Sequence, residues 1–458
     1  MWPRRERRGV FRIVVVLTVV VVCVVYRPDR ALRTATGMVA HDLCSETFVA
    51  GLDPQRTFGE SIAPRPGMRK LGWALRYDVD HAKREAKASL LGAIASRAVY
   101  REKWGCLLVY GDERIDHPLQ IRAGTVSELP IVDPQTPALT SAMDAAFVEP
   151  VEAPHRLTRA VVVVRNGRIV GERYALGYGV DTPMLGFSMT KSVMNALVGI
   201  LVQQGRLSVD KPAPIAAWQG ARDPRRVIMI EDLMRMDSGL ALDETGSGFD
   251  PSNQMFYDEA DMAGYAERAE MVSAPHTRWY YSSASTHLIA RIVRDAVGGD
   301  GDSVQRFASR ELVEPLGMQH VVMEMDATGT PVGGHYLYAS ARDWARFGQF
   351  FLDDGVVNGE RLLPQGWVRW SSEPTLDTAY GAGWWTTRGD NPAAVHWRSV
   401  GIPADTFFAF GNLGQRIAVM PSEKLVIVRM ARAHLPNGDM AGFERLVVDA
   451  TASLHSQK

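Results

Sequence analysis

The sequence lacks the motifs of several large enzyme classes. It contains no GxSxG nucleophile elbow, which argues against an α/β-hydrolase. It has neither a GxxxxGK[ST] loop nor a GxGxxG motif after a predicted strand, so nucleotide binding is not indicated. Its 11 histidines form no HxH or HxxxH pair, and no CxxC occurs. We therefore expect no metal and no other cofactor.

The chain also lacks an excess of charge of either sign. The 51 lysines and arginines nearly balance the 52 aspartates and glutamates, for a formal net charge of −1. This balance gives no reason to expect a nucleic-acid partner. With 458 residues, 46% of them hydrophobic, the chain is long enough to bury a large core. Its function must be inferred from local motifs.

The first 30 residues depart from this balance. Four arginines between positions 4 and 8 precede a valine-rich apolar run over residues 13–26. Such a segment is either a cleaved signal peptide or a retained signal anchor. No small-x-small cleavage site follows closely, which favours the anchor. The arginines would stay in the cytoplasm, so we expect an inner-membrane protein whose remaining chain is periplasmic.

Cysteine is scarce, and its positions fit export. Cys23 lies within the apolar run, which leaves only Cys44 and Cys106 in the rest of the chain. A pair of this kind in an oxidising compartment predicts a disulfide. Two buried free thiols are the alternative.

Composition divides the chain into residues 1–30, residues 31–150 and a main domain over residues 151–455. Residues 27–45 resemble a short tether, and residues 46–145 an accessory layer without chemical motifs. Within that layer, residues 85–100 suit either a helix or a β-hairpin, and their partial alternation favours strands.

Strand patterns lie at both ends of the main domain. Residues 160–174 read as a hairpin closed at Asn166-Gly167, and residues 406–430 contain three strand-like stretches. Helical patterns dominate between them. This order predicts an α+β fold in which one central antiparallel sheet is built from both ends of the domain, flanked by helices, with a mostly helical region inserted.

The main chemical signal is a serine followed by a lysine at the start of a helix. Ser188 and Lys191 are spaced i, i+3, which places them on one helical face. A serine hydroxyl needs an adjacent base, and lysine serves only if burial lowers its pKa. The helix after Lys191 is almost wholly apolar and would supply that environment.

An SxxK spacing also arises by chance. A second one, Ser208 to Lys211, is followed at once by Pro212 and lies in a predicted loop. Taken alone, Ser188 could equally be an ordinary helix N-cap. The rest of the chain decides between these readings.

Five stretches together resemble the β-lactamase-related serine hydrolases, a family that includes class C β-lactamases and DD-peptidases. The greatest likeness is to 6-aminohexanoate-dimer hydrolases. The stretches occur in family order between about residues 155 and 450. They are GFSMTKS at 186–192, IEDLMRMDSGL at 230–240, WYYSS at 279–283, YASARDWAR at 338–346 and YGAGWW at 380–385.

The resemblance implies roles for individual residues. Ser188 would be acylated, and Lys191 would take its proton. Tyr281 would pass a proton to the leaving group and help to activate the deacylating water. The alignment favours Tyr281 over its neighbour Tyr280. A tyrosine can act as a general base only if its pKa of about 10 falls.

Two positions depart from the family pattern. Ser283 stands where the family has asparagine, and it is a possible substrate-binding residue. Asn412-Leu413-Gly414 aligns with the family's Lys/His-Thr/Ser-Gly, so the cationic and hydroxyl side chains are missing. The N–H groups of Ser188 and Gln415 would still form an oxyanion hole. Efficient β-lactam hydrolysis is not expected.

Trp384 and Trp385 could line a substrate cleft or pack in the core. The residues as a whole predict an exported hydrolase acting on a small-molecule amide or ester. The alternatives are a penicillin-sensor protein of the same fold and a structural membrane protein. The sequence gives no indication of the oligomeric state.

Overall fold

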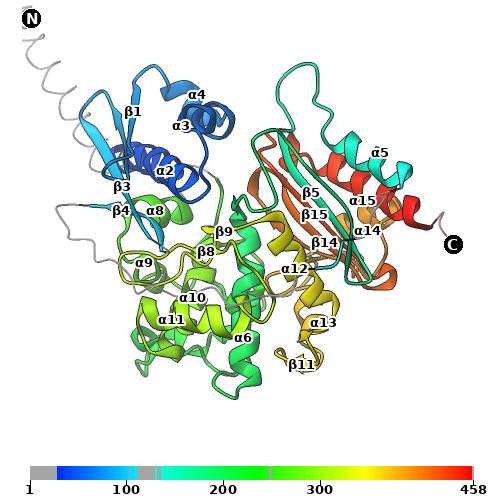
Figure 1. Cartoon of the computed structure of the whole chain (residues 1–458). Coiled ribbons are helices and arrows are strands. Elements are labelled where there is room, and N and C mark those ends of the chain that lie inside the picture. The colour runs from blue at the N-terminus through cyan, green and yellow to red at the C-terminus, as the bar shows by residue number, and fades with distance from the viewer. Residues whose placement is uncertain (1–27, 103, 111–128, 132–135, 247–249, 456–458) are drawn as a thin grey trace, which may run out of the picture.

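The computed structural model describes residues 28–102, 104–110, 129–131, 136–246 and 250–455 (Figure 1). The apolar run of the predicted membrane anchor lies outside these residues. Within them, every helix is too short or too polar to cross a membrane.

A six-stranded antiparallel sheet forms the centre of the main domain. Its strand order is β12-β13-β14-β15-β5-β6. Strand β15 pairs with β5, with Val428 opposite Val162, and this pairing joins the two ends of the domain as predicted. The bounds are β5 Thr158–Arg165, β6 Arg168–Tyr174, β12 Trp385–Thr386, β13 Phe407–Gly411, β14 Gln415–Met420 and β15 Leu425–Ala431.

Alternation along the strands supplies both faces of this sheet with apolar side chains. Val161 and Val163 face one cluster of buried residues, which the terminal helix and its neighbours complete. Val162 and Val164 belong to the main core on the other face. Figure 1 shows the first face covered by α5, α14 and α15 and the second by α12. These helices are α5 Pro137–Ala146, α12 Ala341–Leu352, α14 Pro392–Ser399 and α15 Met440–His455.

The predicted helical region lies beside the second face. Its helices are α6 Thr190–Gln203, α7 Ile230–Arg235, α8 Pro251–Asp258, α9 Met262–Glu267, α10 Ser283–Val297, α11 Gly301–Ala308 and α13 Trp367–Ser372. A small sheet of order β7-β9-β8 connects this region to the main sheet. Its strands are β7 Met184–Leu185, β8 Val322–Met323 and β9 Leu337–Ala339, and a two-stranded ribbon joins β10 Val356–Val357 to β11 Glu360–Arg361.

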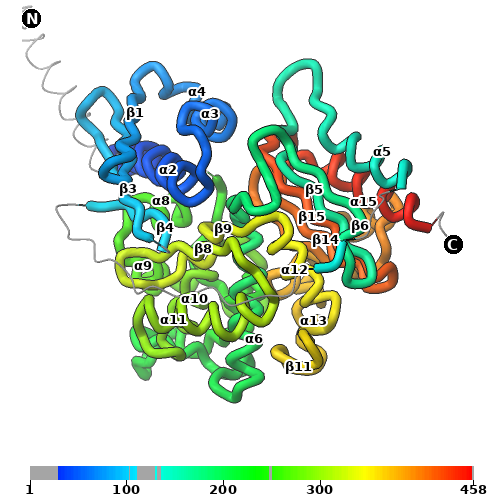
Figure 2. Tube along the Cα trace, in the orientation of Figure 1, coloured from blue at the N-terminus to red at the C-terminus, as the bar shows by residue number. Residues whose placement is uncertain are grey.

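The N-terminal layer corrects one expectation. The predicted tether at residues 27–45 is instead helix α2, Pro28–Phe48, which packs on a four-stranded sheet and on α8 (Figure 2). Hydropathy missed it because several of its buried residues are polar and are paired with distant side chains. The strands are β1 Leu75–Asp80, β2 Glu85–Leu90, β3 Ile94–Arg101 and β4 Gly105–Val109, so residues 85–100 are strands as favoured. Two short helices, α3 Pro54–Thr57 and α4 Pro66–Leu71, lie between α2 and β1.

A disulfide ties this layer together. Cys44 of α2 is bonded to Cys106 of β4, with a Cα–Cα distance of 6.1 Å. This is the pairing that the sequence predicted.

Candidate active site

Ser188 lies in a turn between the small sheet and α6. Residues 187–189 form one turn of 3-10 helix that leads directly into α6. Phe187, just before the serine, has a φ of +50°, in a region that non-glycine residues adopt at a cost of about 1–3 kcal/mol. Phe187 is buried while Ser188 is half-buried, so the turn is anchored in the core by Phe187 and exposes the Ser188 side chain.

Lys191 lies one turn further along, inside the protein. Its Nζ lies 3.0 Å from Ser188 Oγ, 2.9 Å from Ser283 Oγ and 3.0 Å from the carbonyl oxygen of Gly334. Burial lowers the pKa of Lys191 from 10.5 to about 8. A substantial fraction of the amine is therefore neutral near pH 7–8, as a base requires.

Glu244 is the charged group that opposes this shift. Its negative charge raises the pKa of Lys191 against the larger effect of burial. The Glu244 carboxylate accepts hydrogen bonds from the Ser283 N–H at 2.8 Å and from Ser252 Oγ at 3.2 Å. No local sequence pattern marked Glu244, which lies in a loop between α7 and α8.

Tyr281 is the third member of the site. Lys191 Nζ lies 4.7 Å from the centre of its ring, and the phenol is hydrogen-bonded to Ser188. Burial raises the pKa of Tyr281 well above its ordinary value, although the bond to Ser188 opposes the shift. The phenol therefore stays protonated, which suits a proton donor and not the general base that the sequence reading also allowed. Its rival Tyr280 is 38% exposed and lies against Arg278.

Ser283 has a different environment from the one expected. It is fully buried at the start of α10, and its hydroxyl contacts Lys191. This burial beneath the lysine disfavours the predicted role of Ser283 in substrate binding. Gly334 completes this arrangement, since a methyl group there would lie 2.9 Å from Ser283 Cβ. The Gly334 carbonyl was also missed, because a backbone ligand has no sequence signature.

Gly411, the first residue of the segment 411–415, lies against the turn that carries Ser188. A methyl group on Gly411 would overlap the Gly186 carbonyl, so this glycine permits close contact. Asn412 is exposed, and Gly414 packs against Gly438. The Gln415 side chain bonds to the backbone of Ala431 on β15. The segment aligned with the family motif is thus at the site, with Gly411 next to the turn.

Trp384 and Trp385 lie in different environments. Trp384 is fully buried and packs against Phe347, Phe351 and Phe407, so it is a core residue and not a cleft residue. Trp385 is half-buried and lies nearly parallel to the Tyr281 ring, 5.9 Å away. Of these two tryptophans, Trp385 is the one placed to contact a molecule bound at Ser188.

Two other features of the described chain include none of the residues that contact Ser188. His276 bridges the carboxylates of Asp232 and Asp237 with contacts of 3.0 Å each. Burial lowers the pKa of His276, but its bond to Asp237 and the two negative charges outweigh this and raise it. The two buried carboxylates therefore share His276 as their partner.

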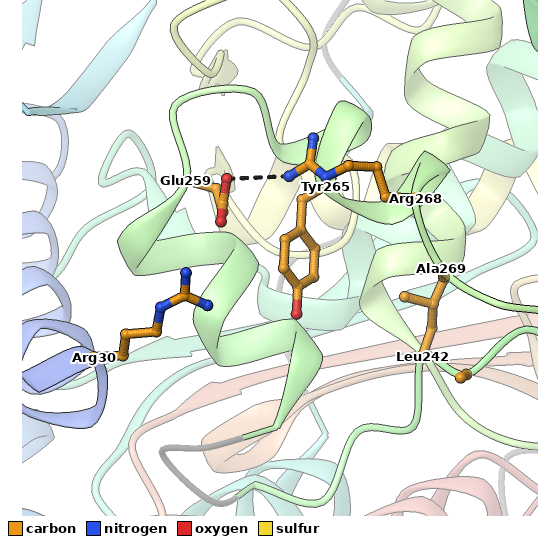
Figure 3. Close-up of a pocket in the computed structure, with 7 residues that line it drawn as sticks. Arg30, Leu242, Glu259, Tyr265, Arg268 and Ala269 are labelled. Atoms are coloured by element: carbon orange, nitrogen blue, oxygen red, sulfur yellow. Dashed lines mark hydrogen bonds and ion pairs between the residues drawn. The ribbon is translucent and has the colours of Figure 1, made fainter. Parts of the chain in front are cut away.

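The second feature is a surface cavity of about 310 Å³ between the start of α2 and helices α8 and α9 (Figure 3). Arg268 in its wall pairs with Glu259 at 3.4 Å. It contains none of the predicted catalytic residues.

Comparison with known families agrees with this geometry. The sequence model of the β-lactamase family matches residues 143–452, most of the chain. The chain belongs to the β-lactamase family. This confirms the predicted family of β-lactamase-related serine hydrolases and the α+β fold of the main domain. Helix α2 and strands β1–β4 lie outside the matched residues.

Individual members of the β-lactamase family are distant from this chain. The 6-aminohexanoate-dimer hydrolase of Paenarthrobacter ureafaciens is 25% identical over 326 residues, which cover 65% of this chain and 80% of that protein. A Bacillus anthracis structure provisionally assigned the same name has 22% identity and a TM-score of 0.55, covering 66% of this chain and 80% of its own. A penicillin-binding protein homologue from Caulobacter crescentus has 18% identity and a TM-score of 0.53, covering 69% and 96%. These two structures share the fold.

Proposed function

We propose that this β-lactamase-family protein cleaves an amide or ester bond through an acyl-enzyme on Ser188. The observation that carries the proposal is the arrangement around Lys191. A neutral amine has two N–H donors and one lone pair. Ser283 Oγ and the Gly334 carbonyl can accept both N–H groups, which leaves the lone pair for the Ser188 hydroxyl 3.0 Å away.

The proposed reaction consists of acylation of Ser188 followed by hydrolysis of the acyl-enzyme. The Ser188 proton passes to Lys191 as Oγ attacks the substrate carbonyl, and the oxyanion forms beside the Ser188 N–H in the turn that leads into α6. The Tyr281 phenol donates its proton to the departing amine or alcohol and regains one from the Lys191 ammonium. Water then attacks the acyl group while Lys191 takes its proton, and Lys191 passes that proton to Ser188 Oγ as the acyl–oxygen bond breaks and the acid leaves.

A second N–H for the oxyanion hole comes from residues 411–415. The sequence reading assigned it to Gln415. The position of Gly411 favours the N–H of Asn412, because the Gly411 carbonyl of the same peptide accepts from Arg416 Nη1 at 2.5 Å. In a trans peptide the N–H points away from that carbonyl.

The substrate that fits is an amide or ester with an apolar acyl chain. Trp385 lies between the rings of Tyr281 and Phe410, and all three are half-buried. Neither Asn412-Leu413 nor Ala409-Phe410, the two residues before Gly411, supplies the family's cationic and hydroxyl side chains, which disfavours a β-lactam. The relative named as a 6-aminohexanoate-dimer hydrolase supports an amide.

A sensor-type protein of the same fold is the second candidate. The raised pKa of Tyr281 favours it, because a phenol that does not ionise is a poor activator of the deacylating water. Such a protein would acylate at Ser188 and hydrolyse the acyl-enzyme slowly.

Export to the periplasm, with the chain held at the inner membrane by residues 1–30, is part of the proposal. The Cys44–Cys106 disulfide supports an oxidising compartment. A fusion of alkaline phosphatase to the C-terminus should be active in the periplasm, and an inactive fusion would exclude this location.

Labelling with a fluorophosphonate probe and turnover of p-nitrophenyl acetate test the chemistry. We expect wild type and Ser208→Ala to be labelled and to turn over the ester, whereas Ser188→Ala should do neither. Ser208 is the matched control, since it begins the second SxxK sequence in a loop. Labelling without turnover would favour the sensor. Labelling that survives in Ser188→Ala would refute the acyl-enzyme.

A further inference from the structure

Two acidic residues on helix α2 face the main domain. Asp42 and Glu46 are spaced i, i+4 and therefore share a face. Both are buried, with 4% and 3% of their surface exposed. Buried carboxylates require partners, and these two find theirs in chain segments that lead to the active site.

Asp42 leads to Lys191. Its Oδ1 accepts a hydrogen bond from the Tyr336 hydroxyl at 2.8 Å, and its Oδ2 accepts one from Arg65 at 2.9 Å. Tyr336 follows Gly334 by two residues, and the Gly334 carbonyl binds Lys191 Nζ. The Asp42–Tyr336 bond thus fixes the segment that presents this carbonyl.

Glu46 leads to Ser188. Its Oε1 pairs closely with Arg432, and its Oε2 lies 3.5 Å from Arg159. The Arg432 guanidinium lies 5.1 Å from the centre of the Phe187 ring. Phe187 holds the positive φ just before Ser188 and needs such support to keep it.

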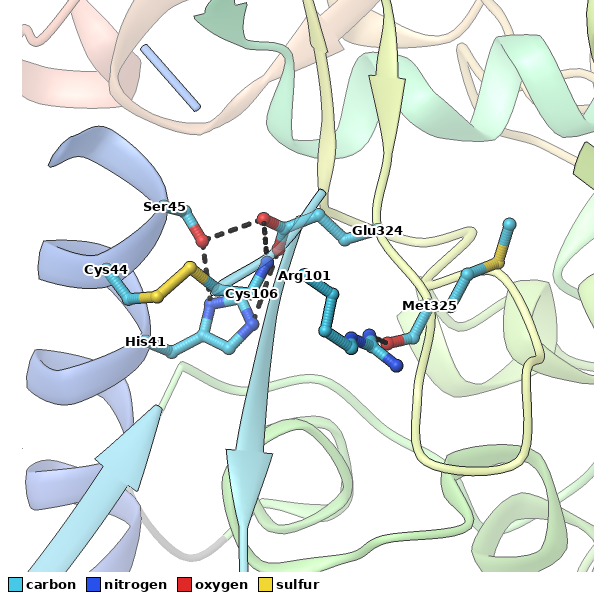
Figure 4. Close-up of a disulfide and its surroundings, with 7 residues drawn as sticks. All are labelled: His41, Cys44, Ser45, Arg101, Cys106, Glu324 and Met325. Atoms are coloured by element: carbon cyan, nitrogen blue, oxygen red, sulfur yellow. Dashed lines mark hydrogen bonds and ion pairs between the residues drawn. A yellow bond between two sulfur atoms is a disulfide. The ribbon is translucent and has the colours of Figure 1, made fainter. Parts of the chain in front are cut away.

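A third set of bonds fixes α2 itself in place (Figure 4). The buried Glu324 carboxyl accepts hydrogen bonds from Ser45 Oγ at 2.8 Å and from the Cys106 N–H at 2.9 Å. These residues adjoin or form the disulfide, and the Glu324 N–H donates to the Tyr336 carbonyl at 3.0 Å. The Glu324 contacts that hold α2 are therefore connected by hydrogen bonds to the segment that contains Gly334.

We propose that Asp42 and Glu46 are positioning residues of the active site, which makes α2 part of the catalytic unit although it precedes the residues matched by the family. This inference rests on the proposed function of Ser188 and Lys191. Asp42 acts through Tyr336 and Gly334 on the direction of the lysine lone pair. Glu46 acts through Arg432 on the Ser188 turn. Neither residue contacts the reacting atoms.

A double-mutant cycle between Asp42→Ala and Tyr336→Phe tests the first path. The readout is inactivation of the full-length protein by a fluorophosphonate, resolved into the saturating rate constant and the half-saturating concentration. We expect each single variant to lower the rate constant about tenfold and to leave half-saturation within about twofold, because orientation is lost while the binding surface stays. The double variant should also lose about tenfold, and not about a hundredfold, since both changes break one path.

Thr36→Val is the matched control. Thr36 is a buried α2 residue whose hydroxyl bonds to Ser96 within the N-terminal layer and does not point to the site. It should lower the free energy of unfolding and leave the rate constant unchanged. If Asp42→Ala does not fold, Tyr336→Phe is compared with Tyr257→Phe, because the Tyr336 hydroxyl lies 2.9 Å from the Tyr257 hydroxyl and also donates to Asp42.

The outcomes separate the two proposals. An unchanged rate constant in Tyr336→Phe, or a loss equal to that of Thr36→Val at equal stability, would overturn the positioning role while Ser188→Ala remains unlabelled. Labelling that persists in Ser188→Ala would overturn the acyl-enzyme and the positioning role together.

Discussion

In two buried polar clusters of this protein, burial brings the pKa of an ionisable group close to neutral pH. At the active site, burial lowers the pKa of Lys191 to about 8, and its neighbours are Ser188, Ser283 and the Gly334 carbonyl. Beside the disulfide, burial raises the pKa of Glu324 to about 8. His41, whose Nε2 lies 3.3 Å from the Glu324 carboxyl, has a pKa lowered by burial to about 3, so the two meet as neutral groups.

The difference between the clusters is access. Ser188 is half-buried, so the lone pair of Lys191 points at a hydroxyl that a substrate can reach. Glu324 is fully buried, and its carboxyl accepts hydrogen bonds from Ser45 of α2 and Cys106 of β4. A perturbed pKa alone therefore does not identify a catalytic group in this molecule. The neighbouring nucleophile does.

The largest effect should follow the loss of the base. Lys191→Ala is expected to lower kcat/KM for p-nitrophenyl acetate by about 10⁴-fold, because the Tyr281 phenol, the other described group bonded to the Ser188 hydroxyl, stays protonated and cannot take its proton. Lys211→Ala removes the exposed lysine of the second SxxK and should leave kcat/KM within about twofold. Equal losses in both variants would mean that Lys191 is not the base that activates Ser188.

Glu324→Gln probes the second cluster through stability. With a pKa raised from 4.5 to about 8, folded Glu324 binds a proton that the unfolded chain has released, so wild-type stability should fall as pH rises from 4.5 to 8. The neutral glutamine has no such dependence. Between pH 4.5 and 8, the free energy of unfolding of wild type should fall by on the order of 4 kcal/mol relative to that of Glu324→Gln. Denaturant unfolding of both proteins at each pH measures this difference.

Activity supplies the control for that experiment. Glu324→Gln should keep kcat/KM within about threefold at pH 7, since a neutral amide can make the same contacts as the protonated acid. Parallel pH-stability curves for wild type and variant would show that Glu324 is ionised when folded.

The smallest effect should come from a partner of the base. Ser283→Ala removes one acceptor for the Lys191 N–H groups, so the lone pair is aimed less well and kcat should fall about tenfold. Ser285→Ala, a buried serine on the same helix, is the comparison and should leave kcat unchanged. If Ser283→Ala raised KM and left kcat intact, Ser283 would bind substrate after all.

Much of this fold follows from local sequence patterns. The hairpin at residues 160–174 and the strands after residue 406 carry β-branched runs and turns, and both lie in the central sheet. Ser188 and Lys191 were found because a fixed spacing on a helix brings them together. The disulfide was predicted because only two cysteines remained outside the apolar run.

The remaining features depend on contacts between distant segments. Gly334 acts through its carbonyl, and Glu244 approaches Ser283 from a separate loop, so neither leaves a local pattern. Trp384 and Trp385 are chemically alike, and only the packing of the first against Phe351 distinguishes core from cleft. Helix α2 was missed because its buried acids look like surface residues until their partners are known.

The pH dependence of fluorophosphonate labelling tests the central claim most directly, because labelling needs only an activated Ser188. The account predicts a rate constant that rises about tenfold per pH unit and levels off near pH 8, where Lys191 loses its proton. Glu244→Gln should move this midpoint to lower pH, because the charge that favours the ammonium is gone. A rate constant that does not change between about pH 6 and pH 9, or a midpoint that persists in Lys191→Ala, would contradict it.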